Sequence, residues 1–379
     1  MSQSSTTDVA VLGAYGAVGQ AALRAIANRR PETRVRLGGR NVARAEALLD
    51  ELGLSGEAVG VDLADGESLA GFCRGSRVVL NCAGPSYVVQ DRVAWAAVAA
   101  SADYVDPGGD EPVFDALRRP GTFTGTAVLT AGMQPGLTGL LPKHLARSMS
   151  HPRSLTAYVG TMDRLTPAGA ADYLLSMGGS YGEAQAAIRG GVRVERELEP
   201  RTDVTLPYFT GRVDAYPYLS FESGQLAASL GLERVDWFNV FEGGAHMMSC
   251  LSRLQGAMHG ESDLAVAAEE LTRAAALDLF GKSPFQLMLF EVTGAHHGSP
   301  VTRSLALRAH DTYAVTGLVS ALAVLDVFAG RVGPGVHFAS DVLDADAMLT
   351  QLRAEPAVNV LDISDRAILS APTMEQGEL

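Results

Sequence analysis

Lysine is almost missing from this chain of 379 residues, since Lys143 and Lys282 are the only two. On supply alone, this scarcity nearly excludes lysine as a catalytic residue. Positive charge as a whole is also low, because 43 aspartates and glutamates oppose 30 lysines and arginines, for a formal net charge of -13. Proteins that bind nucleic acid hold its phosphates with clustered lysine and arginine, so we expect no nucleic-acid partner.

Cysteine is equally sparse, with three residues that lie far apart and form no CxxC pair. This argues against a disulfide framework and a structural zinc site, so we expect no metal. The first residues, MSQSSTTD, are polar and lack the apolar centre of a signal peptide. No apolar run reaches the roughly 18 residues that span a bilayer. The richest run, residues 312–330, is interrupted by Asp326, and we expect it in a protein core. The sequence thus predicts a cytoplasmic protein with no membrane partner.

The pattern of apolar residues divides the chain. From residue 8 to about 142, short apolar runs alternate with helical stretches, which predicts a parallel sheet with crossover helices on both faces. From about residue 153, strands joined by shorter turns predict an α+β domain on an open mixed sheet. The fold class is therefore α/β, with a Rossmann-type doubly wound sheet in residues 1–142 and a substrate and dimerisation domain in 143–310. Residues 311–379 are expected to return to the first domain.

The second predicted domain also suggests an oligomer. An open sheet needs cover on its far face and edges, and the segments VDWFNVFEG and FQLMLFEV are strongly apolar. Because most such assemblies have two-fold symmetry, we expect a homodimer formed through this domain.

The segment DVAVLGAYGAVGQAAL, residues 8–23, carries three glycines spaced three apart, directly after an apolar run. In dinucleotide-binding loops such glycines allow a tight turn, close approach of a pyrophosphate, and close packing of helix on strand. Three glycines are a weak signal in a chain with 41, and a turn without a ligand is the alternative. The strand before the loop and the helix after it favour a phosphate site. The residues expected to contact the pyrophosphate are Gly13, Tyr15, Gly16, Ala17, Val18 and Gly19.

The end of the second predicted strand bears on the choice between NAD and NADP. Enzymes that use NAD place an acid there, about 20 residues after the glycines, to bind the ribose hydroxyls. Here Arg40 takes that position, and arginine pairs with a 2′-phosphate bidentately. Arg44, one helical turn later, adds a second charge; a solvated surface arginine is the alternative role for Arg40. The sequence therefore predicts NADP(H), with Asn41 and Asp62 as further contacts.

Three further stretches carry a family resemblance. VVLNCAGPSYVVQDRVAWAAVAASADYVDPGGD, residues 78–110, resembles the saccharopine dehydrogenase-like reductases, whose fourth strand ends in an N-C-A-G-P type turn and whose fifth ends in Y-V-D. TAGMQPGLTGLL, residues 130–141, is similar to the G-x-x-P-G turn after their sixth strand. Residues 311–344 are similar to the closing helix and G-V pattern of that family.

The resemblance implies a dinucleotide-binding domain and an α/β domain with the active site in the cleft between them. Members reduce imines or oxidise secondary amines, and one branch reduces C=C bonds of polyketide lipids. Saccharopine-forming reductases carry an acid where this chain has Gln134, so saccharopine itself is not the expected substrate. The resemblance places the remaining cofactor contacts at Asn81, Ala83, Gly84, Pro85, Gly132, Pro135 and Gly136.

Reduction of an imine also needs a proton donor whose pKa is not far from neutral. Ligands of open α/β sheets bind at the carboxyl ends of the strands, which favours Tyr87 and Asp110. Asp106 lies nearby, with a helix cap or turn residue as its alternative role. In the second domain, His246 stands in the glycine-flanked turn EGGAHMMS, and a histidine pair stands in TGAHHGSP; loop or core histidines are the alternative there. We expect His246, Tyr87 and Asp110 to be catalytic.

Three functions remain open at the level of the sequence. The first is an NADPH-dependent reductase of a C=N bond in a small amino-acid-derived or specialised-metabolite substrate. The second is a trans-acting C=C reductase of a carrier- or lipid-bound substrate. The third is a scaffold or sensor that binds NADP(H) without turnover, which loss of a proton donor at the site would favour.

Overall fold

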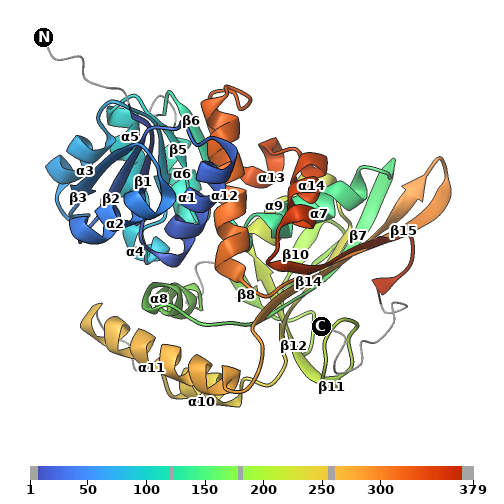
Figure 1. The fold of residues 1–379 in the computed structure, drawn as a ribbon. Coiled ribbons are helices and arrows are strands. Elements are labelled where there is room, and N and C mark those ends of the chain that lie inside the picture. Colours follow the sequence, from blue (N-terminus) through green and yellow to red (C-terminus); the bar gives the residue numbers. More distant parts are fainter. Residues whose placement is uncertain (1–6, 120–122, 178–181, 255–260, 369–379) are drawn as a thin grey trace, which may run out of the picture. The chain divides into compact units, whose positions relative to one another are not determined.

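The computed structural model describes residues 7–119, 123–177, 182–254 and 261–368. The chain forms two compact units, and each unit is assembled from two segments. Unit 1 comprises residues 7–137 and 313–344, and unit 2 comprises residues 138–312 and 345–368. Figure 1 colours both units along the chain. Among the described residues, no helix is long and apolar enough to cross a membrane.

Unit 1 is built on seven strands in the spatial order β16-β6-β5-β4-β1-β2-β3, all of them parallel. The chain reverses its direction of winding between β1 and β4, and ligands of such sheets bind at the carboxyl ends near this switch point. The predicted Rossmann-type sheet is therefore confirmed. Its strands are β1 Thr7–Leu12, β2 Val35–Gly39, β3 Gly56–Gly60, β4 Ser76–Asn81, β5 Asp103–Val105, β6 Thr126–Leu129 and β16 Gly335–Phe338.

Helices connect the strands of unit 1 (Figure 1). The apolar run that the sequence places in a core forms α12, and ten of its residues are buried. Gly317 of α12 lies so close to α1 that an added Cβ would be 2.4 Å from the Cβ of Ala21. This helix therefore packs inside the unit. The helices are α1 Ala17–Arg29, α2 Val42–Leu52, α3 Gly66–Cys73, α4 Ser86–Val89, α5 Arg92–Ala99, α6 Glu111–Leu117, α12 Thr312–Phe328 and α13 Ala339–Val342.

Unit 2 is built on a 10-stranded mixed sheet whose main path runs β10-β9-β13-β7-β14-β15-β17. β13 and β7 are parallel, and β14 pairs antiparallel with both of its neighbours. The predicted second domain on a mixed sheet is confirmed. Its strands are β7 His151–Met162, β8 Gly182–Ala184, β9 Ala187–Arg189, β10 Val192–Val194, β11 Arg201–Val204, β12 Val213–Ser220, β13 Arg234–Phe241, β14 Phe285–His296, β15 Ser299–Ala309 and β17 Val358–Ser364. Its helices are α7 Leu137–Ala146, α8 Pro167–Ser176, α9 Phe221–Leu230, α10 Ala245–Leu254, α11 Glu261–Leu279 and α14 Ala345–Ala354.

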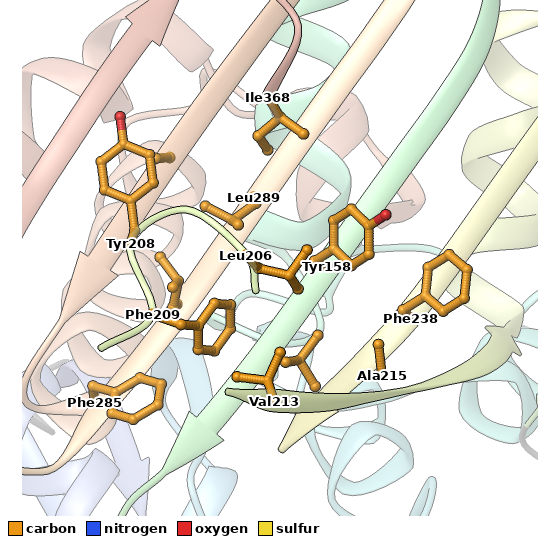
Figure 2. Packing of buried hydrophobic residues seen from close by; sticks show 13 residues of the cluster. Tyr158, Leu206, Tyr208, Phe209, Val213, Ala215, Phe238, Phe285, Leu289 and Ile368 are labelled. Carbon is orange, nitrogen blue, oxygen red and sulfur yellow. The ribbon is translucent and has the colours of Figure 1, made fainter. Parts of the chain in front are cut away.

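An aromatic core covers one face of the second sheet (Figure 2). Tyr158 of β7 and Phe238 of β13 stack with their ring centroids 5.2 Å apart. Residues 206–209 lay two further aromatic rings and a leucine onto this cluster, and Ile368 joins it from the end of the described chain. This part of the face is thus covered by the unit's own residues.

The segment after residue 310 differs from the prediction. Residues 313–344 belong to unit 1, as expected, but β17 pairs antiparallel with β15. Residues 345–368 therefore belong to unit 2. The physical reason is that the outer edge of β15 would otherwise present a row of unpaired backbone groups, and β17 supplies their partners. The first change of unit also falls at residues 137 and 138, a few residues before the predicted boundary at 142.

The two apolar strands that motivated the dimer prediction lie inside the sheet. β13 is paired with β7 on one side and with β12 and β9 on the other, and β14 lies between β7 and β15. Trp237, Phe238 and Phe290 on these strands are buried. Their apolar character serves the core of a single chain, so it gives no support to an interface at these strands, and the dimer itself stays a prediction.

Candidate cofactor and active site

The glycine loop joins β1 to α1 and has the geometry of a phosphate-binding turn. Gly13 has a φ of +73°, and an added Cβ would lie 2.5 Å from the carbonyl oxygen of Cys82 on β4's exit. At Gly19 an added Cβ would lie 2.4 Å from the carbonyl oxygen of Gly13. Gly16 is exposed and is the N-cap of α1, with no side chain to cover the first-turn N–H groups. These free donors and the positive end of the helix dipole fit a pyrophosphate.

The exit of β2 forms a second part of the candidate cofactor site. The Tyr15 hydroxyl accepts a hydrogen bond from the backbone N–H of Asn41 at 2.9 Å. The guanidinium of Arg44 lies 4.8 Å from the centroid of the Tyr15 ring. Arg40 and Arg44 are both exposed, so two cations stand where the ribose of the nucleotide meets this strand in related sheets. The site fits an anionic group on that ribose.

Asp62 lies in the turn after β3. Its carboxylate accepts the N–H of Ala64 at 2.9 Å, and its own N–H donates to the Ser68 hydroxyl at 3.0 Å. The side chain is exposed. Asp62 therefore shapes the entry of α3, and its predicted contact with the cofactor stays a prediction, as do those of Ala17 and Val18 in the first turn of α1.

A buried polar network ties the exit of β4 to the exit of β5. The Asp106 carboxylate accepts hydrogen bonds from the Tyr104 hydroxyl at 2.5 Å, the Asn81 amide at 3.0 Å and the backbone N–H of Gly108 at 2.8 Å. The Asn81 carbonyl oxygen accepts the N–H of Ala83 at 3.2 Å. Burial raises the pKa of Asp106 above its ordinary value, although these hydrogen bonds act in the opposite direction. The network holds the Asn81–Pro85 turn in place.

Sequence reasoning weighed Asp106 but missed Tyr104. Side chains two residues apart on a strand point to the same face, and Tyr104 and Asp106 stand in this relation in the Y-V-D sequence. Burial, and next to it the neighbouring Asp106 carboxylate, raise the pKa of Tyr104 well above its ordinary value. The tyrosine therefore stays protonated and acts as a hydrogen-bond donor to Asp106. The two-residue spacing within Y-V-D is the signal that could have revealed this pair.

Asp110 and Tyr87, two of the predicted catalytic residues, are brought together by the fold. Asp110 is the N-cap of α6 and accepts the N–H of Glu111 at 3.0 Å. Burial raises the pKa of Asp110 to about 6, and a hydrogen bond from the Tyr87 side chain works in the opposite direction. Both side chains are half-buried. A carboxyl group with this pKa can hold or release a proton near neutral pH.

The loop after β6 packs against the same strand exit. Thr130 donates its N–H to the carbonyl of Gly108 at 2.6 Å, and Ala131 donates to that of Asp106 at 2.8 Å. Gly136 has a φ of +128°, and an added Cβ would lie 2.3 Å from the carbonyl oxygen of Gly132. Pro135 follows a cis peptide bond, as does Pro85 in the turn after β4. The loop after β6 thus contacts the exit of β5, where Asp106 is in turn hydrogen-bonded to Asn81 at the end of β4.

His246, the third predicted catalytic residue, belongs to unit 2. Its Nδ1 lies 2.9 Å from a carboxylate oxygen of Asp278 on α11, and the backbone N–H groups of His246 and Met247 donate to the same carboxylate at 3.1 and 2.8 Å. Burial alone raises the pKa of Asp278, but these hydrogen bonds lower it below its ordinary value. Asp278 therefore caps α10 as an anion and leaves Nε2 as the imidazole atom open to a ligand.

The histidine pair lies at the hairpin between β14 and β15. His297 has a φ of +48°, so it leaves the strand geometry, and its ring meets that of His296 edge-on at 4.1 Å between centroids. In the described parts of the chain, no group of three or more histidine, cysteine or acidic side chains is arranged to hold a metal ion.

Comparison with known proteins agrees with this geometry. Residues 9–130 match the family model described as the Saccharopine dehydrogenase NADP binding domain. No curated protein sequence matches the chain. The sequence-based resemblance is thereby confirmed for the segment that contains the glycine loop, Arg40 and the Asp110–Tyr87 pair.

Two solved structures are similar over nearly the full length. Saccharopine dehydrogenase (L-Glu forming) from Saccharomyces cerevisiae has 16% sequence identity and a TM-score of 0.65, with 95% of this chain and 100% of that chain covered. Homospermidine synthase from Legionella pneumophila, solved in complex with NAD, has 10% identity and a TM-score of 0.58, with 99% and 96% covered. At these identities the likeness concerns the fold of both units.

Proposed function

Because residues 9–130 match the family model described as the Saccharopine dehydrogenase NADP binding domain, we propose that the protein is an NADPH-dependent reductase of a C=N bond. Its substrate is a small molecule, derived from an amino acid or from specialised metabolism. The observation that carries the proposal is the Asp110–Tyr87 pair, a carboxyl group with a pKa of about 6 at the carboxyl edge of the sheet. A non-catalytic scaffold has no need for such a group.

The choice of NADPH rests on Arg40 and Arg44. Both side chains are exposed at the exit of β2, and a guanidinium pairs bidentately with a phosphate. An acidic residue in this position would favour unphosphorylated ribose. Homospermidine synthase, similar in fold, was solved with NAD, so the preference has to come from these side chains and not from the fold.

The protein's own residues manage the proton. When bound, NADPH supplies the hydride for the imine carbon. Asp110, in its protonated form, transfers its proton to the imine nitrogen, which becomes an amine as the carbon is reduced. Asp110 is left as a carboxylate, and the hydrogen bond from Tyr87 stabilises that charge. The raised pKa makes the protonated form available without a strongly acidic medium.

The test is Asp110→Asn, with Asp115→Asn on the exposed side of the same helix as the matched control. Turnover, followed by loss of NADPH absorbance with a panel of cyclic imines and amine–oxoacid pairs, should fall about 10²–10⁴-fold in Asp110→Asn only. NADPH affinity should not change in either variant. Since the protonated carboxyl group is the active form, activity of the parent should decline as pH rises through about 6, and Asp110→Asn should lose this dependence.

Two outcomes would contradict the proposal. Full turnover by Asp110→Asn would remove Asp110 as the proton donor. NADPH oxidation with α,β-unsaturated thioesters but with no imine of the panel would replace C=N by C=C reduction, the second function that the sequence leaves open.

A further inference from the structure

Tyr15, in the middle of the glycine loop, turns its ring toward the exit of β2. An added Cβ at Gly39, the last residue of β2, would lie 2.5 Å from a carbon of this ring and 3.0 Å from its hydroxyl oxygen. The backbone of Tyr15 is fixed as well, because its carbonyl oxygen accepts a hydrogen bond from the Gln20 amide at 2.8 Å. The half-buried ring therefore has a defined place, at the strand exit where the ribose of a nucleotide lies in related sheets.

The hydroxyl group of Tyr15 has a hydrogen left to donate. A tyrosine hydroxyl carries one hydrogen and can also accept hydrogen bonds. It accepts the backbone N–H of Asn41 at 2.9 Å, a contact that does not use the hydrogen. Among the described residues, no group accepts that hydrogen. The hydroxyl can therefore donate to an anionic ligand at the exit of β2, where such a hydrogen bond is strong.

The ring of Tyr15 also supports Arg44. The guanidinium carbon of Arg44 lies 4.8 Å from the ring centroid, within the range of a cation–π contact. Within the described ranges Arg44 has no carboxylate partner, and its side chain is exposed. Ordering a long arginine side chain costs conformational entropy, so a ring that already orients the guanidinium lowers the cost of binding an anion there.

We propose that Tyr15 is a specificity-determining residue for the 2′-phosphate of NADPH. Its hydroxyl donates to a phosphate oxygen, and its ring holds Arg44 against the same group. The hydroxyl is held at the exit of β2 by Gly39 and Asn41, whereas a pyrophosphate meets the N-terminus of α1. Tyr15 is thereby assigned to the ribose phosphate instead of the pyrophosphate. The proposal rests on the choice of NADPH made above, and it adds Tyr15 to the charges of Arg40 and Arg44.

Fluorescence titration of the full chain with NADPH and with NADH, which lacks only the 2′-phosphate, tests the proposal without any turnover. Tyr15→Phe should weaken NADPH binding about tenfold, the effect of one hydrogen bond to a charged group, and should leave NADH binding unchanged. Tyr15→Leu should weaken NADPH binding by about a further two- to fivefold, because the ring is lost as well. Tyr216→Phe on β12 of unit 2 removes the same atom from another half-buried tyrosine and should change neither affinity.

A double-mutant cycle measures the support of Arg44 by the ring. In the Arg44→Gln background, Tyr15→Leu should bind NADPH as well as Tyr15→Phe does, because the ring no longer has a guanidinium to hold. If the difference between the two variants persists in that background, the ring does not act through Arg44, and this part of the proposal is overturned.

The remaining outcomes separate this proposal from the one on which it rests. Equal losses of NADPH and NADH affinity in Tyr15→Phe would place Tyr15 at the pyrophosphate and overturn its assignment. A parent that prefers NADPH, with the same preference in Tyr15→Phe, would overturn the role of Tyr15 and leave the choice of NADPH standing. Equal affinity of the parent for both cofactors would overturn the choice of NADPH and this proposal with it. Thermal melting without cofactor shows that the variants are folded.

Discussion

At the scale of single residues, environment gives two neighbouring aspartates different tasks. Asp106 is buried, and three hydrogen-bond donors occupy its carboxylate. Asp110, four residues later, is half-buried and caps a helix, with a pKa raised to about 6 by burial. Asp106 therefore holds two strand exits together, while Asp110 can exchange a proton with a ligand.

Cofactor preference is decided at Arg40. Arg40→Asp should lower NADPH affinity roughly tenfold to a hundredfold, since a charged bidentate contact contributes about 1.5–3 kcal/mol. Affinity for NADH should change little or improve. Fluorescence titration with both cofactors measures the effect. Arg74→Asp, exposed in the segment that leads into the amino end of β4, is the control with equal charge change. Equal affinity of the parent for both cofactors would show that the exit of β2 does not select NADP.

His246 is the candidate proton donor of unit 2. Asp278 is an anion and accepts only, so Nδ1 carries a hydrogen, and a proton given to a substrate has to be a second hydrogen, on Nε2. If His246 and not Asp110 is the donor, His246→Asn reduces turnover about 10²–10⁴-fold and leaves NADPH binding intact, while Asp110→Asn keeps full turnover. Asp278→Asn should release the ring, which nitrogen NMR shifts of His246 would show as a change of tautomer. Unchanged turnover of His246→Asn leaves the role with Asp110, as proposed above.

At the scale of elements, the segment made of β1, the glycine loop and α1 depends on backbone contacts that leave no room for a side chain at its glycines. The neighbour of Gly13 is the carbonyl group of Cys82, which belongs to the exit of β4. The loop is therefore held by two strands at once. A glycine in this place serves packing as well as phosphate binding.

Comparing Gly13→Ala with Gly53→Ala separates the cost of the steric clash from the cost of the left-handed backbone conformation. Both glycines have a left-handed φ, +73° and +61°, but only Gly13 has atoms within contact of the added Cβ. We expect Gly53→Ala to cost about 1 kcal/mol of unfolding free energy, and Gly13→Ala roughly 3 kcal/mol or more. Thermal or urea unfolding measures both. Equal losses of unfolding free energy would mean that the loop shifts to accommodate the added Cβ at no extra cost.

At the scale of the whole molecule, neither unit is a continuous stretch of chain. Unit 1 takes α12, β16 and α13 from the late part of the sequence, and unit 2 takes α14 and β17. Ile368, at the end of the described residues, is buried in the core of unit 2, and its N–H donates to Glu291 at 2.7 Å. The end of the described chain thus completes the second core.

Ile368→Ala tests this assignment. Removing a buried isoleucine side chain should cost about 2–4 kcal/mol of unfolding free energy, whereas the exposed neighbour Arg366→Ala should change it little. NADPH affinity should stay the same, because Ile368 belongs to unit 2. Melting temperature and cofactor titration measure the two effects. A loss of NADPH affinity with an unchanged melting temperature would instead place this segment with unit 1, as the sequence alone suggested.

The sequence by itself determined the features that depend on neighbours along the chain. Alternation of short apolar runs with helical stretches predicts the parallel sheet, because a strand and its crossover helix are local. The glycine loop and Arg40 lie within such local units, so their places could be derived from spacing, whereas the Y-V-D stretch was identified by its resemblance to a family. The pairing of Tyr87 with Asp110 was within reach for the same reason, since both follow neighbouring strands.

Tertiary structure decided everything that depends on which distant strands and helices meet. The same apolar pattern suits a central strand and an exposed interface, so the burial of Trp237 in β13 was decided only by its pairing on both sides. β17 joined unit 2 because an edge of β15 was open to it. Asp278 reached His246 across 32 positions of sequence. Hydrogen bonds and burial between distant segments have no signature in local spacing, and it is these that set the charge of a carboxylate and the surface left for a partner.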